Sequence, residues 1–426
     1  MDLPLPSTSS DGPIVARRTL LKALSGVVAF SSPAGAALRS VPPASRSAVV
    51  VGAGIIGVSI AYHLARRGLA VTVIDKGQPG MGCTQGAFAM LIAGHAEGPE
   101  HFNALYGLAV EDWRRLQAEI AAPLPIQWGG TLAWAAPGKG AAELERERRQ
   151  LTAWGVAVEP LDIADIARLS PGVVAGQFGA GCFMPAQGAV DPLGALRILV
   201  GQCEQLGVRF RTAAVAGLPV DAAGVAHVTT DRGPIAADCI VLAAGAASTK
   251  LAATAGVTVP LEIVSGTLAH SKPLPPILSR VLNTPSGSIK QTQDGRIVTG
   301  LDYAPGADGK DVSDDYGRKL LATAAKVVPA IRGVELDYMT VGYVPIPARD
   351  QQPIVGFCGR PANLYIATMM SGITMAPLIG RLAASEIVEG RPLDVLAPYR
   401  PRRFNNSWAL PGHGRSAGSY RDRRSA

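Results

Sequence analysis

One stretch near the start of the chain constrains the fold more than any other, and it runs SAVVVGAGIIGVSIAYHLARRGLAVTVIDKG from Ser47 to Gly77. It opens with consecutive valines, which are typical of a strand buried in a parallel sheet. A glycine turn, a helix-like segment that ends at Gly68 and the apolar strand AVTVID follow in that order. This order of strand, turn, helix and strand predicts a βαβ unit that binds a dinucleotide.

The turn has the spacing G-x-G-x-x-G, and each glycine has a physical task. Gly52 permits a tight turn, Gly54 lets the backbone approach a pyrophosphate, and Gly57 lets the helix pack closely on the strand. The N–H groups at the start of the helix then face the phosphates. Asp75, at the end of the second strand, can accept hydrogen bonds from an unphosphorylated ribose, which favours FAD or NAD over NADP.

The order of the later segments decides between FAD and NAD. NAD enzymes usually complete their sheet in consecutive βα units. Here a helix over residues 102–119 and a strand over residues 125–137 intervene, and buried-strand character returns only around 207–215 and 238–248. We therefore predict an α/β fold in which a Rossmann-like FAD-binding domain is interleaved with an α+β substrate domain built on an antiparallel or mixed sheet.

Several later motifs, together with the first βα unit, resemble the FAD-dependent D-amino-acid oxidase superfamily and within it the glycine-oxidase-like branch. CTQGAFAMLIAGHAE at 83–97 is similar to the family's segment beneath the flavin, and IVLAAGAAS at 240–248 is similar to a late flavin-domain strand. Other matching segments are GAVDP at 188–192, DQQPIVG at 350–356, SGITMAPLIGRLAASEIVEG at 371–390 and YRPRRF at 399–404. The resemblance implies FAD as the cofactor and does not specify a substrate.

The resemblance also implies how the two domains alternate. FAD-binding pieces are expected at residues 47–90, 188–250 and 350–404, and substrate-domain pieces at residues 91–187 and 251–349. The residues expected to contact FAD are Gly52, Ala53, Gly54, Ile55, Ile56, Gly57, Asp75, Lys76, Thr84, Gln85, Ala87, Val215, Ala244, Gly245, Gly372, Ile373 and Thr374. The helix that starts at the last three would direct its positive end at the flavin and stabilise the reduced ring.

The substrate side departs from the family pattern. A Gly-x-Arg-Pro element of the amino-acid oxidases supplies an arginine that clamps the substrate carboxylate. Here the arginine position is Val344, or Tyr343 in a shifted alignment, and a second arginine position of the glycine oxidases is Met370. We therefore expect an apolar pocket, built by Met90, Val344, Met369 and Met370, that suits a larger amine.

Other polar side chains are weaker candidates. Arg349 is an alternative clamp, although a loop arginine is more often solvated. His63 is expected to pack inside the first helix, and the charged segment at 141–150 is expected to form a solvated helix face. Candidates for orienting substrate or approaching the flavin rim are Tyr303, Tyr338, Tyr343, Lys290, His270, His95 and His101. Hydride transfer needs no strong base when the amine binds deprotonated.

Residues 1–36 have the order of a twin-arginine export signal. Arg17 and Arg18 precede an apolar run that is too short to span a bilayer, and an Ala-Gly-Ala cleavage site follows. Because this route carries folded proteins, we expect FAD to be inserted first, the export translocase to be a partner, and the protein to be periplasmic or secreted.

Charge and cysteine content exclude other classes of function. The net charge of +7 comes from the signal and from an arginine-rich end that starts at Arg400, so the body is close to neutral, which argues against nucleic-acid binding. The end after residue 404 is expected to be disordered. The five cysteines follow no metal or disulfide spacing, and no later apolar run suits a stable membrane span.

These observations favour an FAD-dependent oxidoreductase that oxidises a C–N bond of an amine or amino-acid-like substrate. A hydride would pass to flavin N5, and the electrons would then reach a quinone, a dye-like or other acceptor, or O2. Two alternatives stay open. One is a catalytically silent flavin-bound subunit or binding protein, which the missing arginines motivate, and the other is an NAD-linked dehydrogenase.

Overall fold

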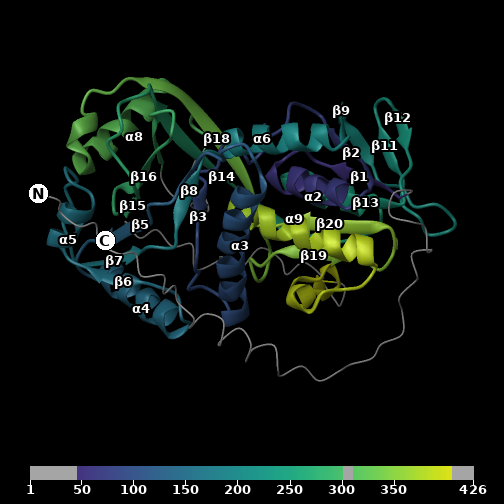
Figure 1. Cartoon of the computed structure of the whole chain (residues 1–426), viewed down its shortest axis with the longest axis horizontal. Helices are drawn as coiled ribbons and strands as arrows, with labels where there is room; N and C mark the ends of the chain where they lie inside the picture. The colour runs from purple at the N-terminus through teal and green to yellow at the C-terminus, as the bar shows by residue number, and fades with distance from the viewer. Residues whose placement is uncertain (1–45, 301–309, 405–426) are drawn as a thin grey trace, which may run out of the picture.

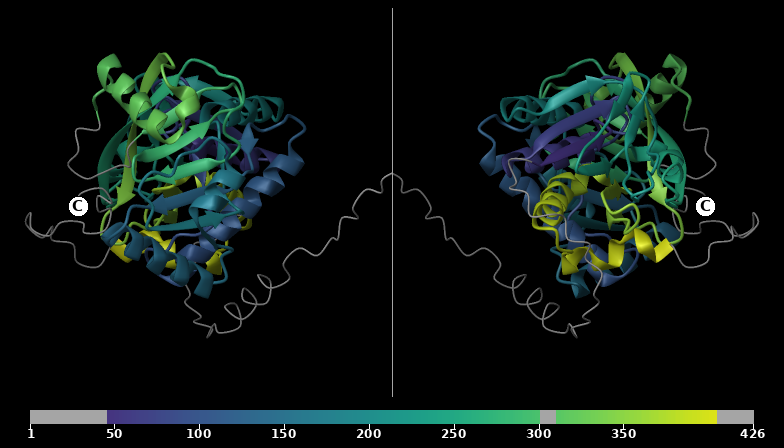
Figure 2. Two further views of the ribbon diagram at one scale, coloured as in Figure 1. Left: turned by 90° about the vertical axis from the view of Figure 1, so that its left-hand side faces the viewer. Right: turned by 90° about the vertical axis from the view of Figure 1, so that its right-hand side faces the viewer.

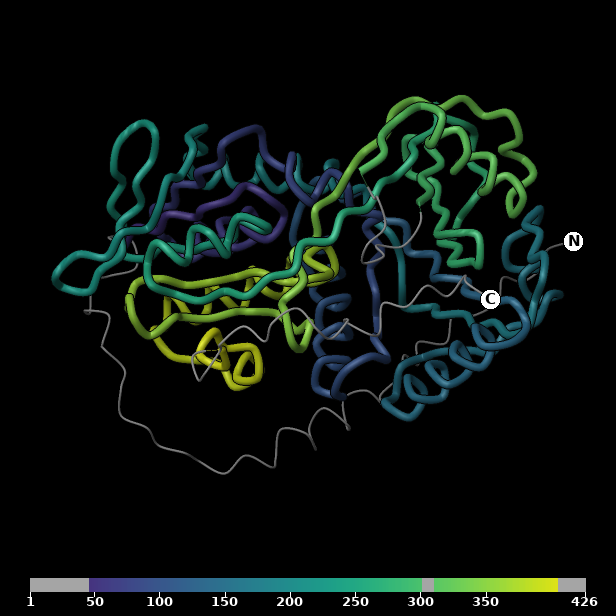
Figure 3. The backbone as a smooth tube through the Cα atoms, turned by 180° about the vertical axis from the view of Figure 1, so that it is seen from behind, coloured from purple at the N-terminus to yellow at the C-terminus, as the bar shows by residue number. Residues whose placement is uncertain are grey.

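The computed structural model describes residues 46–300 and 310–404. The predicted export signal, Tyr303 and the segment after residue 404 lie outside the described residues. Two large sheets form the two halves of the molecule, and helix α3 (Glu100–Glu119) lies between them (Figures 1 and 3). The predicted α/β fold class is confirmed.

In the described part of the chain, one half is a six-stranded sheet in the order β19-β20-β13-β1-β2-β9. Its strands are β1 (Ser47–Val51), β2 (Ala70–Asp75), β9 (Arg209–Thr212), β13 (Cys239–Leu242), β19 (Ile354–Phe357) and β20 (Leu364–Thr368). Neighbouring strands are parallel except for the β19–β20 pair. Three stretches of sequence that are far apart therefore build one Rossmann-like sheet, as the predicted interleaving requires.

Helices α2 (Ile55–Arg66), α6 (Pro192–Gln205) and α9 (Gly372–Glu389) pack against this sheet. The side views show α9, in yellow, beside the purple strands β1 and β2 (Figure 2). Helix α3 fixes the start of α9, because Nε1–H of Trp113 donates to the carbonyls of Ile373 and Thr374 at 3.0 and 3.1 Å. The positions of these helices bring the first turn of α9 to the edge of the sheet where the parallel strands end.

The other half, as far as the structure describes it, is an eight-stranded mixed sheet in the order β18-β14-β17-β16-β15-β5-β7-β6. Its strands are β5 (Thr131–Ala135), β6 (Glu159–Leu161), β7 (Ala180–Met184), β14 (Leu261–Ser271), β15 (Val281–Thr284), β16 (Gly287–Gln291), β17 (Ile297–Gly300) and β18 (Leu336–Pro347). Its helices are α4 (Lys139–Ala153), α5 (Ile163–Leu169) and α8 (Asp314–Val327). The long antiparallel pair β14–β18 reaches back toward the first half (Figure 3).

Short elements complete the described chain. They are β3 (Met90–Leu91), β4 (Ile126–Gln127), β8 (Gly188–Val190), β10 (Val215–Gly217), β11 (Val228–Thr230), β12 (Gly233–Ile235), α7 (Ser248–Ala253), η2 (Gly245–Ala247), η3 (Pro329–Ile331), η4 (Asp394–Tyr399) and η5 (Pro401–Phe404). The single strand predicted over 125–137 is wrong, because β4 and β5 join different sheets. Gly130, at φ +77°, turns the chain between them, and a Cβ on Gly129 would lie 1.9 Å from the Ser279 carbonyl oxygen.

Two arginines of the segment that matches the family's usual end, Arg400 and Arg403, are held in the fold by ion pairs. Arg400 donates to the carboxylate of Glu386 in α9, which also accepts a hydrogen bond from the Tyr365 hydroxyl at 2.8 Å. Arg403 forms an ion pair with Asp350 at 2.9 Å. Glu386 is only 1% exposed, and a buried carboxylate is stable only with a cationic partner. Across residues 46–300 and 310–404, no helix combines the length and the apolar character that crossing a membrane requires.

His63 packs between α2 and α9, as expected. Its Nε2 is buried without a hydrogen-bond partner in the described structure, and a Cβ on Gly380 would lie 2.8 Å from its ring. Burial, aided by the positive charges of Arg66 and Arg381, lowers the pKa of His63 from 6.5 to about 3. The unfolded chain therefore binds more protons between these two values, and stability falls as the pH falls through that window.

We expect His63→Leu to remove this pH dependence. By pH 5 the wild-type free energy of unfolding should drop by about 2 kcal/mol more than that of the variant, relative to pH 7.5. Urea unfolding of both proteins at the two pH values measures the difference. Identical pH dependence would show that His63 is protonated in the folded protein at little cost.

Candidate active site

A cavity of about 1390 Å³ lies between the two halves and takes lining residues from both large sheets. At the six-stranded sheet its wall is the edge where the parallel strands end, marked by Val51, Asp75 and Thr368. Carboxyl ends of parallel strands are the usual binding edge of such sheets. The cavity continues from this edge past the start of α9 to the face of the eight-stranded sheet.

Most residues predicted to contact FAD line this cavity. They are Gly52, Gly54, Ile55, Ile56, Asp75, Lys76, Thr84, Ala87, Val215, Ala244, Gly245, Gly372, Ile373 and Thr374. Ala53, Gly57 and Gln85 are not among the lining residues. The Ala53 N–H donates to Asp75 Oδ2 at 2.8 Å, and the Gln85 amide donates to the Met81 carbonyl at 2.7 Å. The structure thus places the side chain of Gln85 away from the position that the resemblance implied.

The glycine turn fits a pyrophosphate. The nearest atom to a Cβ added at Gly54 is Thr84 Oγ1 at 3.6 Å, so this backbone faces open space. The Ile55 N–H donates to the same Thr84 oxygen at 3.2 Å. The next two N–H groups of α2, on Ile56 and Gly57, have no acceptor among the residues that the structure describes. Free N–H groups beside open space at a helix start are an anion-binding arrangement.

The start of α9 forms the next part of the wall. Ser371 adopts a left-handed conformation with φ 56° and ψ 30°, and the helix begins directly after it. The Tyr106 hydroxyl donates to Ser371 Oγ at 2.9 Å, and the Thr374 hydroxyl donates to the Met90 carbonyl at 2.9 Å. These bonds hold the positive end of the helix at the cavity, where it would stabilise negative charge on a flavin ring if FAD binds there.

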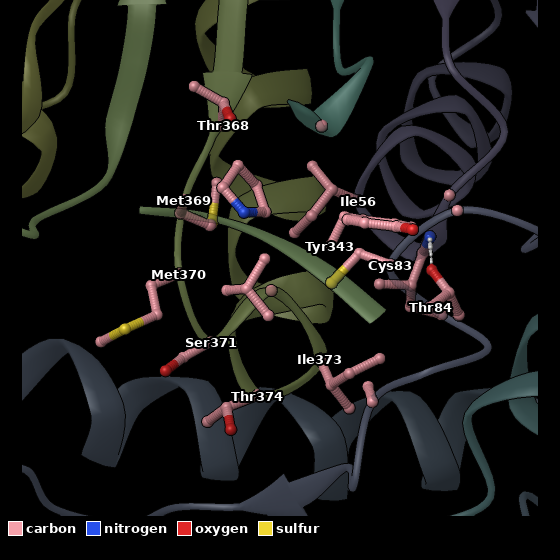
Figure 4. Close-up of a pocket in the computed structure, with 18 of the residues that line it drawn as sticks. Ile56, Cys83, Thr84, Tyr343, Thr368, Met369, Met370, Ser371, Ile373 and Thr374 are labelled. Atoms are coloured by element: carbon pink, nitrogen blue, oxygen red, sulfur yellow. Dashed lines mark hydrogen bonds between the residues drawn. The ribbon is translucent and has the colours of Figure 1, made fainter. Parts of the chain in front are cut away.

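The predicted apolar pocket is assembled in the same cavity by Met90, Tyr343, Val344, Met369 and Met370. Figure 4 shows Met369 and Met370 on one side of the pocket and Tyr343 on the other, with Ile56 and Cys83 nearby. The aromatic ring and the thioethers give this part of the wall no cation and little polarity.

Arg349 does not supply the missing cation. It is exposed in the turn after β18, with φ 82°, and it is not among the residues that line the cavity. The solvated position that is more frequent for a loop arginine is therefore the observed one.

Comparison with known proteins places the chain in a family. Residues 47–386 match the family model described as FAD dependent oxidoreductase. The chain belongs to this family. The prediction of an FAD-dependent oxidoreductase is confirmed, and the NAD-linked alternative is excluded.

Individual relatives and solved structures resemble this oxidoreductase over most of its length. It is 26% identical to glycine oxidase of Geobacillus kaustophilus over 82% of this chain and 95% of that protein. It is 28% identical to the 4-methylaminobutanoate oxidase (formaldehyde-forming) of Paenarthrobacter nicotinovorans over 81% of this chain and 44% of that larger protein. The crystal structure of the Geobacillus glycine oxidase has the same fold, with a TM-score of 0.76, 23% identity, and coverage of 84% of this chain and 99% of that chain.

The oxidoreductase also has charged lining residues that sequence reasoning missed. Glu147 and Arg148 of α4 line the cavity, although the helix was expected to present a solvated face. The signal in the sequence was the pair Leu144 and Leu151, one on each side at helical spacing, which marks an inward face.

His95 is the histidine that reaches the cavity, as one of the two candidates was expected to do. Its Nδ1 donates to the Glu97 carbonyl at 2.9 Å, which fixes the orientation of the ring. Its ring stacks on Tyr106, with ring centroids 5.2 Å apart and 13° between the planes. His101 instead contacts Gln352 at 3.2 Å and is not a lining residue.

The other polar candidates serve the packing of the second half. Lys290 is fully buried and donates to the Val190 carbonyl at 2.9 Å, and burial lowers its pKa to about 7. His270 stacks on Tyr338 and contacts the Thr340 hydroxyl at 2.9 Å, and burial lowers its pKa to about 4. Lys290, His270 and Tyr338 do not line the cavity.

Proposed function

We propose that this oxidoreductase oxidises the C–N bond of an amine that carries no carboxylate on the reacting carbon. The observation that supports the proposal is the pair Val344 and Met370, two apolar lining residues at the positions where the resemblance predicts arginines. A carboxylate in an apolar pocket loses its hydration without gaining a partner. The names of two relatives, glycine oxidase and 4-methylaminobutanoate oxidase, give substrates that differ in the position of the carboxylate. Glycine carries it on the carbon next to the amine, whereas a propylene chain separates amine and carboxylate in 4-methylaminobutanoate.

FAD, when bound, supplies the two-electron acceptor for the reaction. The residues of the chain bind and orient the amine. Met90, Val344, Met369 and Met370 surround it with apolar groups, which exclude water and disfavour the ammonium form. The neutral amine carries the lone pair that promotes loss of hydride from the adjacent carbon, so this pocket needs no strong base.

Anaerobic mixing of the flavin-loaded protein with a panel of amines tests this proposal. Primary and secondary alkylamines are expected to bleach the flavin absorbance, and glycine and D-alanine are expected to bleach it slowly or not at all. Re-oxidation by O2, a quinone and an artificial dye then identifies the electron acceptor. A flavin that no amine reduces would instead support the silent-subunit alternative.

We further propose export of the folded, FAD-loaded protein by the twin-arginine translocase to the periplasm or the medium. The support is the residue order of the first 36 positions, with Arg17 and Arg18 before a weakly apolar run. The absence of a disulfide spacing among the five cysteines is consistent with folding in a reducing compartment.

Replacing Arg17 and Arg18 together with lysine is expected to leave a folded, flavin-loaded precursor in the cytoplasm. Fractionation with a flavin assay of each compartment provides the measurement. Normal accumulation of the double variant outside the cytoplasm would contradict this route, because lysine preserves the charge and removes only the paired arginines.

A further inference from the structure

One face of α4 lines part of the cavity, and in Figure 1 this helix and α2, which follows the glycine turn, lie on opposite sides of α3. Leu144, Glu147, Arg148 and Leu151 line the cavity and occur at the spacing that puts helical residues on one side. The segment 94–97 also lines the cavity and packs on this face, since a Cβ on Gly94 would lie 3.1 Å from Leu151. We call these α4 residues and segment 94–97 the α4 wall.

The α4 wall lies at a distance from the start of α9. The Tyr106 hydroxyl donates to Ser371 Oγ at 2.9 Å, and the ring of His95 stacks on the ring of Tyr106 at 5.2 Å. The side chain of Tyr106 therefore lies between Ser371 and His95, which belongs to the α4 wall. A substrate whose reacting carbon lies near the start of α9 reaches the wall only with a group several bonds away.

Arg148 lines the cavity, unlike the neighbouring arginines Arg146 and Arg149. Its side chain is 21% exposed, whereas those of Arg146 and Arg149 are 66% and 67% exposed. Glu145 accepts hydrogen bonds from Nε and one terminal nitrogen of Arg148 at 2.8 and 2.6 Å. The guanidinium has five N–H donors, so three keep no acceptor among the residues that the structure describes. Glu145 thus orients the guanidinium of Arg148 and leaves three of its N–H donors for another acceptor.

The other charges that line the cavity do not offer such donors. Lys76 and Lys250 are on the nucleotide side, next to Asp75 and to the η2 segment. Glu97 and Glu147 of the α4 wall are acidic and already take part in further interactions. Arg148 is the one arginine among the described lining residues. A guanidinium with free donors recognises a carboxylate through parallel N–H···O bonds.

We propose that Arg148 binds an acidic group of the substrate that is several bonds away from the reacting C–N bond, with Glu145 as its positioning residue. This inference rests on the proposed function and names its substrate class as amines with a remote carboxylate. Such a molecule avoids an unpaired charge beside Val344 and Met370 and gains a charge-assisted contact at the α4 wall.

The first experiment measures binding without turnover. Hexanoate has the length of 4-methylaminobutanoate and cannot be oxidised at nitrogen. Calorimetry compares its affinity for the flavin-loaded wild type, Arg148→Met and Arg149→Met. Arg149 is the matched control, because it is on the same helix and also approaches Glu145, at 3.8 Å, but faces solvent. We expect Arg148→Met to bind hexanoate at least tenfold more weakly and Arg149→Met to match the wild type.

The second experiment measures flavin reduction by 4-methylaminobutanoate and by N-methylbutylamine, which has a methyl group in place of the carboxylate. Arg148→Met should raise the apparent dissociation constant at least tenfold for the acid only. Equal affinities of Arg148→Met and Arg149→Met for hexanoate would overturn the assignment of Arg148. The same holds if the wild type does not bind hexanoate. If no amine reduces the flavin while hexanoate binding still requires Arg148, the proposed function fails and the acid-binding site stands.

Discussion

Gly54→Val is expected to yield a folded protein that contains no FAD. The valine side chain would fill the space in front of the first turn of α2, where the nearest atom to an added Cβ is 3.6 Å away. No backbone atom blocks the substitution, and Gly54 has φ −74° and ψ 173°, which valine adopts readily. The fold therefore tolerates valine at this position, but the valine side chain leaves no room for the pyrophosphate of FAD. The flavin-to-protein absorbance ratio and the circular dichroism spectrum measure the two effects separately.

Gly57→Ala is the matched control, and it is expected to lower the stability of the fold, whereas Gly54→Val is expected to prevent FAD binding. Its Cβ would lie 2.0 Å from the Gly52 carbonyl oxygen and 3.2 Å from a Val50 methyl group, so α2 would have to move away from β1. We expect a loss of about 3 kcal/mol in stability, because backbone atoms cannot move aside as a flexible side chain does. A Gly54→Val protein that purifies with a full complement of FAD would contradict the assignment of this turn.

Val344→Arg is expected to change the substrate class. Position 344 lies on β18 opposite Val264 of β14, and it is one of the residues that line the cavity. An unpaired carboxylate there costs several kcal/mol, and each tenfold change in rate corresponds to about 1.4 kcal/mol. Even half of that cost removes most of the turnover of small amino acids. The new arginine should therefore raise the efficiency of flavin reduction by D-alanine at least tenfold.

The comparison of D-alanine with ethylamine isolates the role of the carboxylate, since the two differ only in that group. Val344→Met controls for side-chain length without charge and should leave D-alanine a poor substrate. Rapid-mixing flavin reduction with both compounds gives the rates. Fast reduction of the wild-type protein by D-alanine would refute the argument, and it would show that another cation holds the α-carboxylate.

Local patterns in the sequence predicted the glycine turn and the buried parallel strands of the six-stranded sheet, because each pattern there records a backbone requirement. The space around Gly52 and Gly57 admits no Cβ, and this requirement produces the spacing that the sequence shows. The buried strands β1 and β13 are continuous apolar runs because both faces of a parallel sheet are covered. The missing arginines at Val344 and Met370 were visible once the motifs were aligned.

Long-range contacts escaped prediction because they depend on where distant segments meet. The burial of Arg400 against Glu386 and the separation of β4 from β5 follow from neighbours that local periodicity does not reveal. Gln85 follows a motif in sequence, yet its side chain turns back to the Met81 carbonyl.

By itself, the sequence determined the class of cofactor and the apolar character of the pocket, because a glycine turn and the identity of a lining residue are local properties. The tertiary structure decided which charged residues share the cavity with them. In sequence, Arg148 is one of several arginines in a charged helix, and the spacing of Leu144 and Leu151 marks an inward face without showing what that face meets. Packing of Leu144 and Leu151 fixes the rotation of α4, and that rotation alone directs Arg148 inward and Arg149 to solvent.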